Sequence, residues 1–140
     1  MKKLFIILVF MLLYVLPSNS QNMENENPGY ILTEIWNAKP SWFVLSKEER
    51  QTFFNEKINP LLMGEIKSGA EILGCAVNDN TGSERMDYQF MAIWKFPNKE
   101  SSDKLEKAAK DAGFLKYFNQ VNFSGNMIPP PVLNEKMVEL

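Results

Sequence analysis

The order of hydrophobic patterns along residues 30–124 constrains the fold more than any other feature of this chain. Four segments are rich in β-branched and aromatic residues and are bounded by Pro, Gly or Asn, so we expect strands at Tyr30–Trp36, Ala70–Asn78, Met86–Phe96 and Gln120–Ser124. Helical spacing of apolar residues occupies the gaps after the first and third of these strands. The order β-α-β-β-α-β predicts an α+β fold, the ferredoxin-like sandwich, with a four-stranded antiparallel sheet and two helices on one face.

The ends of both helices carry recognisable signals. Ser46 and Glu49 have the spacing of a capping box, in which each side chain bonds the backbone N–H of the other residue. Pro60 falls inside the helical pattern that follows, and it should kink this helix because its ring crowds the preceding turn. Gly69 ends the first helix and Gly113 ends the second, after which residues 114–119 are expected to form a further helical turn.

Residues 1–20 have the pattern of a secretory signal peptide. Lys2 and Lys3 are followed by the uncharged run Leu4–Leu16 and by small residues up to Ser20. The apolar run is shorter than the roughly 20 residues that span a bilayer. We therefore expect an exported protein, periplasmic or extracellular, with no stable membrane anchor after cleavage.

The remaining chain divides into three parts. The polar residues 21–29 predict a flexible spacer, and residues 30–125 are expected to form the folded ferredoxin-like domain. Residues 126–140 form a tail in which Pro129-Pro130-Pro131 favours an extended polyproline conformation.

Composition excludes several classes of function. All 17 acidic residues lie after residue 20, whereas two of the 15 basic ones precede it, so cleavage moves the net charge from −2 to −4. This acidic balance, without a basic stripe, argues against nucleic-acid binding. The chain has no histidine and one cysteine, Cys75, so histidine-assisted hydrolysis is excluded, and neither a metal site nor a cofactor is expected. The apolar run around Cys75 favours a buried small hydrophobe over a reactive nucleophile.

Strand alternation predicts which side chains face the helices. On the third strand the alternate set Tyr88, Phe90, Ala92, Trp94 and Phe96 is expected to face them. From the other strands we expect the helix-facing set to include Ile31, Thr33, Ile35, Val121 and Phe123. The opposite, open face would then show Leu32, Glu34, Trp36, Gln89, Met91, Ile93, Gln120 and Asn122.

This mixed apolar and polar face is the predicted functional surface. Exposed apolar patches normally mark association surfaces, so we expect a homodimer formed through the open sheet face. Glu34, Trp36, Gln89 and Asn122 are the candidate ligand-binding residues of a cavity on this face. Glu34 has two interpretations: a partly buried carboxylate with a polar partner, or a general base whose pKa burial raises.

The chain resembles a bacterial family of small domains of uncharacterised function in the dimeric α/β-barrel superfamily. The motifs that carry the resemblance are Glu34-x-Trp36, Lys39-Pro40-x-Trp42, Leu45-Ser46-x-Glu48-Glu49-Arg50, Gly69-x-Glu71-x-Leu73-Gly74, Asn78-Asp79, Asp87-Tyr88-x-Phe90-x-Ala92-x-Trp94-x-Phe96-Pro97 and Tyr117-Phe118-x-Gln120-Val121-Asn122-x-Ser124-Gly125. Members of that superfamily include cofactor-independent monooxygenases, haem-degrading enzymes, muconolactone isomerases and stress-response barrels. The resemblance implies the fold and dimerisation, and members that handle haem generally use a histidine, which this chain lacks.

Three functional hypotheses follow. The first is an exported homodimer that binds a small, partly apolar molecule. The second is a cofactor-independent monooxygenase or isomerase with Glu34 as the base and Trp36, Gln89 and Asn122 positioning the substrate. The third is a protein-interaction module that uses the C-terminal tail.

Overall fold

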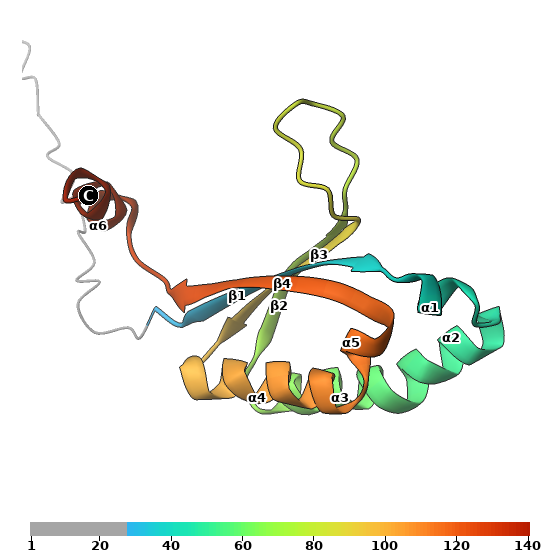
Figure 1. Ribbon diagram of the computed structural model, residues 1–140. Helices are drawn as coiled ribbons and strands as arrows, with labels where there is room; N and C mark the ends of the chain where they lie inside the picture. Colours follow the sequence, from blue (N-terminus) through green and yellow to red (C-terminus); the bar gives the residue numbers. More distant parts are fainter. Residues whose placement is uncertain (1–27) are drawn as a thin grey trace, which may run out of the picture.

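The computed structural model describes residues 28–140, and Figure 1 shows how its elements are arranged. The predicted signal peptide and residues 21–27 of the predicted spacer lie outside the described residues. The strands are β1 (Tyr30–Ala38), β2 (Glu71–Val77), β3 (Phe90–Phe96) and β4 (Phe118–Asn126). The helices are α1 (Pro40–Phe43), α2 (Lys47–Phe53), η1 (Phe54–Ile58), α3 (Asn59–Lys67), α4 (Lys99–Asp111), α5 (Phe114–Tyr117) and α6 (Pro130–Val138).

The four strands form one antiparallel sheet in the order β2-β3-β1-β4. Helices α3 and α4 pack against one face of this sheet, and α2 and η1 lead into α3 (Figure 1). The predicted ferredoxin-like α+β sandwich is therefore confirmed. The β2–β3 loop projects from the sheet away from the helices (Figure 1).

Two sequence features explain the first long helix: the capping box at its start and Pro60 near its middle. The Ser46 hydroxyl accepts the Glu49 N–H at 3.1 Å and the Glu49 carboxylate accepts the Ser46 N–H at 2.7 Å, which confirms the capping box. Just before the position of the predicted kink the helix widens into the π-helical segment η1, and the Asn59 N–H bonds to the Phe54 carbonyl. Pro60 is the second residue after η1, and its missing N–H and bulky ring disfavour regular α-helical bonding in the preceding turn.

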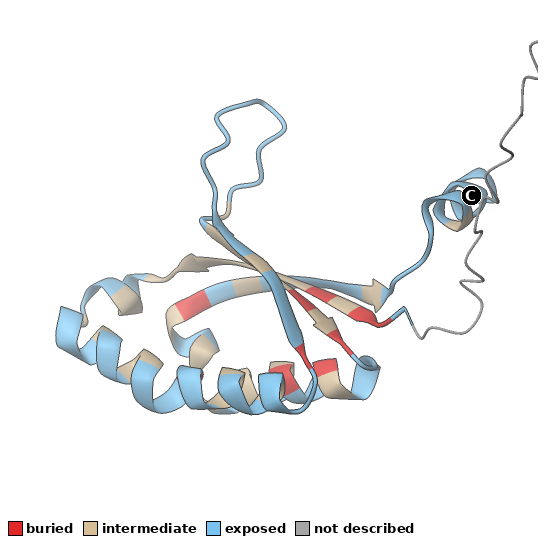
Figure 2. Ribbon diagram, turned by 180° about the vertical axis from the view of Figure 1, so that it is seen from behind, coloured by how far each residue is buried: buried red, intermediate tan, exposed pale blue. Residues whose placement is uncertain are grey.

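The core lies between the sheet and the helices. Leu32, Trp94, Phe96 and Leu105 are almost wholly buried there, and Figure 2 shows the buried segments on the strands and the facing side of α4. Burying side chains of this size stabilises the fold by roughly 1.5–3 kcal/mol each. These four core side chains therefore come from β1, β3 and α4.

The cross-strand register corrects the predicted faces of β1 and β4. Leu32 lies opposite Trp94 and Glu34 lies opposite Ala92, and residues that are directly opposite share a face. Leu32, Glu34 and Trp36 therefore face the helices, and so do Gln120 and Asn122. The open face instead carries Ile31, Thr33, Ile35, Met91, Ile93, Val121 and Phe123. The prediction for β3 is confirmed for Phe90–Phe96, whereas Tyr88 and Gln89 lie in the loop before the strand.

The C-terminal tail departs from the predicted polyproline conformation. Residues 130–138 form helix α6, and Pro130 and Pro131 occupy its first turn, where an N–H would have no partner within the helix. Figure 1 shows α6 standing apart from the sheet and the helical layer. Its residues Leu133 and Met137 are exposed. Across residues 28–140, no helix is long and apolar enough to cross a membrane.

Candidate functional site: a cavity between the sheet and the helices

A cavity of about 190 Å³ lies between the sheet and the helical layer. Strand β1 contributes Glu34 and Trp36 to its wall, and β3 contributes Trp94. Leu61 of α3 and Leu105 of α4 form part of the opposite wall. Glu34 is the charged residue among the residues that line it. The cavity is therefore an apolar space with one carboxylate.

Glu34 is held by two neutral hydrogen-bond donors. Its Oε2 accepts the indole Nε1–H of Trp94 at 3.0 Å, and its Oε1 accepts the amide of Gln120 at 2.7 Å. The same Gln120 nitrogen donates to Oδ1 of Asn122 at 2.8 Å. This chain of bonds fixes the carboxylate and leaves the Asn122 amide nitrogen without a bond among those that the described residues make. The first predicted interpretation, a partly buried Glu34 with polar partners, is the observed one.

Burial raises the pKa of the Glu34 carboxyl above its ordinary value of 4.5. The hydrogen bonds from Gln120 and Trp94 lower this pKa, and the negative charge of Glu106 raises it further. Burial has the largest effect because the apolar walls replace the water that would solvate the charge. Among the described residues, no ion pair includes Glu34.

A register shift in β2 gives the cavity a fourth wall. Between Ile72 and Gly74 the pairing with β3 slips by one residue, which places both Ile72 and Cys75 on the helix side. Regular alternation would put these two residues on opposite faces. Cys75 was predicted to be buried, but it is exposed. It lies on the edge strand, where the cavity adjoins a shallow hollow of about 250 Å³ that Trp36 and Cys75 also line.

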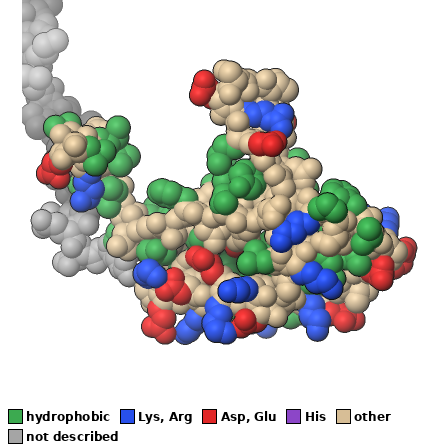
Figure 3. All heavy atoms as spheres, in the orientation of Figure 1, with side chains coloured by type: hydrophobic (Ala, Val, Ile, Leu, Met, Phe, Trp, Pro, Cys, Tyr) green, Lys and Arg blue, Asp and Glu red, His purple; other side chains and the backbone are tan. Residues whose placement is uncertain are grey.

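A more polar hollow of about 330 Å³ adjoins the cavity on the side of α4 and β4. Ala109 and Phe114 line both spaces, and Asn122 lines the outer one. Lys107 and Lys110 lie at this hollow, and Lys107 forms an ion pair with Asp111 of α4. Figure 3 shows acidic and basic side chains interspersed over the helical layer.

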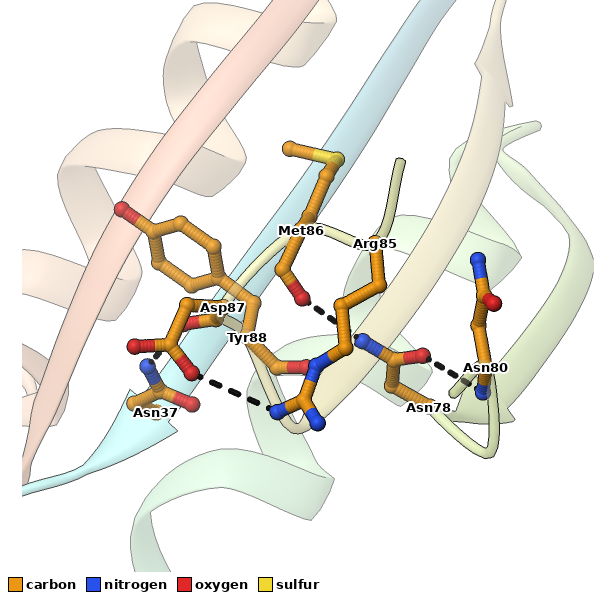
Figure 4. A network of polar contacts seen from close by, with 7 residues as sticks. All are labelled: Asn37, Asn78, Asn80, Arg85, Met86, Asp87 and Tyr88. Atoms are coloured by element: carbon orange, nitrogen blue, oxygen red, sulfur yellow. Dashed lines mark hydrogen bonds and ion pairs between the residues drawn. The ribbon is translucent and has the colours of Figure 1, made fainter. Parts of the chain in front are cut away.

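Gln89, the remaining candidate, does not belong to this cavity. Its Oε1 accepts the Ala38 N–H at 3.2 Å at the base of the β2–β3 loop. An open hollow of about 590 Å³ lies there, and Figure 4 shows its polar network. Asn37 donates to the Asp87 carbonyl at 2.7 Å, and Arg85 pairs with the Asp87 carboxylate at 3.4 Å. The structure thus brings Glu34 and Trp36 together, places Asn122 next to them through Gln120, and separates Gln89.

Two residues of the site were missed as partners of Glu34. The prediction placed Trp94 and Glu34 on opposite faces of the sheet, which ruled out a contact between them. It placed Gln120 on the same face as Glu34 but did not name it as the partner. The sequence did contain a usable indication: an indole N–H and a carboxylate each need a hydrogen-bond partner when they are buried. Matching the Trp94 indole N–H with the Glu34 carboxylate on the neighbouring strand would have predicted their hydrogen bond.

Replacing Glu34 by glutamine should flatten the dependence of stability on pH. The folded state holds the Glu34 proton more tightly than the unfolded chain does, so wild-type stability declines as the pH rises from 4.5 through the raised pKa. A glutamine side chain does not titrate, so the Glu34→Gln variant should not show this decline. Its free energy of unfolding should therefore rise relative to that of the wild type as the pH increases across this window. Urea unfolding at a series of pH values measures the difference.

The exposed Glu56 on η1 provides the control. The Glu56→Gln variant should follow the wild type across the same pH series. If Glu34→Gln also followed the wild type at every pH, the carboxylate would not be buried as described.

Among the residues that line the cavity, Glu34 and Cys75 are the ones whose side chains commonly ligate metal ions. In residues 28–140 no three His, Cys, Asp or Glu side chains are grouped so as to hold a metal. The chain has no histidine to ligate haem iron. A cavity of about 190 Å³ also has room for a single ring and not for a tetrapyrrole.

The fold and the cavity define a class: a single ferredoxin-like domain with a mainly apolar pocket between sheet and helices. Residues 29–140 match the family described as "Family of unknown function (DUF6616)". The chain therefore belongs to this family, and the match includes the tail that carries α6. A search of curated proteins found no match to the chain.

Solved structures share the fold. A chlorite dismutase variant from Candidatus Nitrospira defluvii is 11% identical over 75% of this chain and 42% of its own, with a TM-score of 0.60. A second variant of that enzyme is 18% identical over 81% of this chain and 46% of its own, with a TM-score of 0.59. The methylated RPA0582 protein is 11% identical over 76% of this chain and 86% of its own, with a TM-score of 0.50. This chain spans less than half the length of the chlorite dismutase chains, and identities this low show the fold alone.

Proposed function

We propose that this protein binds a small, largely apolar molecule in the cavity beneath the sheet, next to Glu34. The observation that carries the proposal is a carboxylate held at the wall of an otherwise apolar space. A mainly apolar pocket with one fixed polar group is the usual construction of a small-molecule site, in which the polar group sets the orientation of the ligand.

The cavity volume limits the size of the ligand. An engineered apolar cavity of about 150 Å³ binds benzene. The cavity of about 190 Å³ therefore has room for one ring with a short substituent, or for an alkyl group of similar volume. A longer ligand would extend into the adjoining hollow beside Asn122.

A thermal-shift series with single-ring compounds tests this proposal. A ligand at about 100 times its Kd should stabilise the fold by about 2.7 kcal/mol, which raises the Tm by several degrees. Ala109→Leu places a larger side chain in the wall of the cavity and should abolish the shift. Lys104→Leu adds a leucine at an exposed position of the same helix and should retain the shift.

Two results would count against the cavity as the binding site. One is the absence of any shift across aromatic and alkyl compounds. The other is a shift that Ala109→Leu leaves unchanged.

A second candidate function is a cofactor-independent monooxygenase or isomerase. The raised pKa of Glu34 favours it, because a general base works best when its pKa lies closer to neutrality. Glu34 would be the base, and Trp36 and Asn122 would position the substrate. Gln89 has no part in this candidate because it lies at the loop base.

The protein is also proposed to be an exported homodimer. Export rests on the pattern of residues 1–20. Dimerisation rests on the open sheet face, where Phe123 is 74% and Val121 43% exposed, together with Ile31 and Ile93 on the neighbouring strands. Pairing two such faces would remove these apolar side chains from water. The exposed apolar residues of α6 support the third hypothesis, that the tail docks on another protein.

A further inference from the structure

The cavity combines a carboxylate that makes no ion pair among the described residues with a wall of aromatic rings. Trp36, Phe54, Trp94 and Phe114 line it together with Glu34, and its lining includes no lysine or arginine. The rings come from β1, η1, β3 and α5, so the fold gathers them from four separate elements. Trp36 contacts Phe114 edge to face with ring centroids 6.0 Å apart.

This combination is suited to a positive charge. The face of an aromatic ring attracts a cation, and the attraction is stronger when the cation is shielded from water. The Glu34 oxygens accept bonds from the neutral donors Trp94 and Gln120, so its negative charge has no counter-charge among the described residues. A carboxylate oxygen can accept more than one hydrogen bond, and a ligand ammonium could add its own to those present.

The surrounding charges favour the same ligand class. The negative charge of Glu106 on α4 adds to the negative potential at Glu34. Three lysines flank Glu106 in the chain: Lys104 pairs with Glu100, and Lys107 and Lys110 line the outer hollow, so none of the three lines the cavity. A cation inside the cavity would therefore meet a carboxylate and aromatic side chains.

We propose that the cavity recognises a small organic cation: an amine whose ammonium group contacts Glu34 and the rings of Trp36 and Trp94, and whose apolar body fills the remaining space. This inference rests on the proposed binding function and names its ligand class. The volume of about 190 Å³ sets the size at one ring, or a branched alkyl group, carrying the amine.

Calorimetric titration with a matched pair of probes tests the ligand class. Benzylamine and benzyl alcohol have the same ring and nearly the same size, and they differ in charge. The wild type should bind benzylamine at least about tenfold more tightly than benzyl alcohol. Glu34→Gln should remove this preference, whereas the control Glu56→Gln, on the exposed side of η1, should keep it.

The outcomes separate the ligand class from the proposed function. Equal or tighter binding of benzyl alcohol would overturn the ammonium assignment and leave cavity binding intact. A preference for benzylamine that survives Glu34→Gln would also overturn it. If neither probe bound, the ammonium assignment would fail, and the proposed function would fail with it only if the thermal-shift series also gave no stabilisation.

A second measurement on the wild type keeps the inference testable if Glu34→Gln does not fold. Cys75 lines the cavity and is exposed, so its alkylation rate reports occupancy. Benzylamine should slow alkylation at concentrations at which benzyl alcohol does not. Equal protection by both probes would contradict the assignment.

Discussion

Replacing Trp94 by alanine should lower the free energy of unfolding by about 3–5 kcal/mol. Trp94 is 2% exposed and stacks on Phe96 with ring centroids 5.9 Å apart. Removing its ring opens a large void in the centre of the core and also takes away the donor that bonds Glu34 at 3.0 Å. Equilibrium unfolding in urea, followed by circular dichroism, measures the loss.

Trp94→Phe separates packing from hydrogen bonding. It keeps most of the ring volume and removes the indole N–H, so it should cost about 1–3 kcal/mol. If Trp94→Ala remained within about 1 kcal/mol of the wild type, Trp94 would not be the core residue that its burial indicates.

Replacing Phe123 by aspartate should dissociate the proposed homodimer. Phe123 is 74% exposed on the open face of β4, where a partner sheet would cover it. Burying an unpaired carboxylate in that interface should raise the dimer dissociation constant by at least about a hundredfold, since an uncompensated buried charge costs several kcal/mol. Sedimentation velocity across a concentration series measures the change.

Thr52→Asp on α2 is the matched control. Thr52 is exposed on the helical layer, away from the open face, so this variant should retain the association of the wild type. A dimer that tolerates Phe123→Asp would use another surface. A wild-type protein that stays monomeric at micromolar concentration would contradict the proposed dimer altogether.

Local sequence patterns were sufficient to predict the four strands, the two main helices and their order, but they did not predict α1 or α6. Each strand carries β-branched and aromatic residues between breakers, and the capping box at Ser46 and the terminal Gly69 and Gly113 mark the helix ends. Both glycines adopt positive φ, a conformation that favours glycine. These signals depend on neighbouring residues only, and the ferredoxin-like topology followed from their order.

The choice of sheet face required non-local information. In β3 the two alternate sets differ strongly, because the set containing Trp94 is apolar and the other contains Asp87 and Lys95. In β1 both sets are largely apolar and Glu34 is the one charged residue, so the polarity of that residue decided the prediction. The register across the sheet turned Glu34 toward the helices, where Trp94 and Gln120 satisfy its carboxylate.

The conformation of the tail and the position of Gln89 also could not be predicted from local sequence patterns. Three consecutive prolines favour an extended segment, but proline is equally suited to the first turn of a helix, and the residues after Pro131 decide between the two. Gln89 was grouped with Glu34 by alternation, yet it lies where the loop leaves the sheet and bonds the backbone of Ala38.

The most direct test of the cavity as a ligand site is an NMR titration with benzylamine that follows the three indole N–H signals. Trp36 and Trp94 line the cavity, whereas Trp42 packs in the aromatic cluster of α1, η1 and β4. The signals can be assigned with single Trp→Phe variants. We expect the Trp36 and Trp94 signals to shift saturably with one common Kd while the Trp42 signal moves little. Unchanged Trp36 and Trp94 signals, or equal shifts of all three, would contradict a ligand bound beside Glu34.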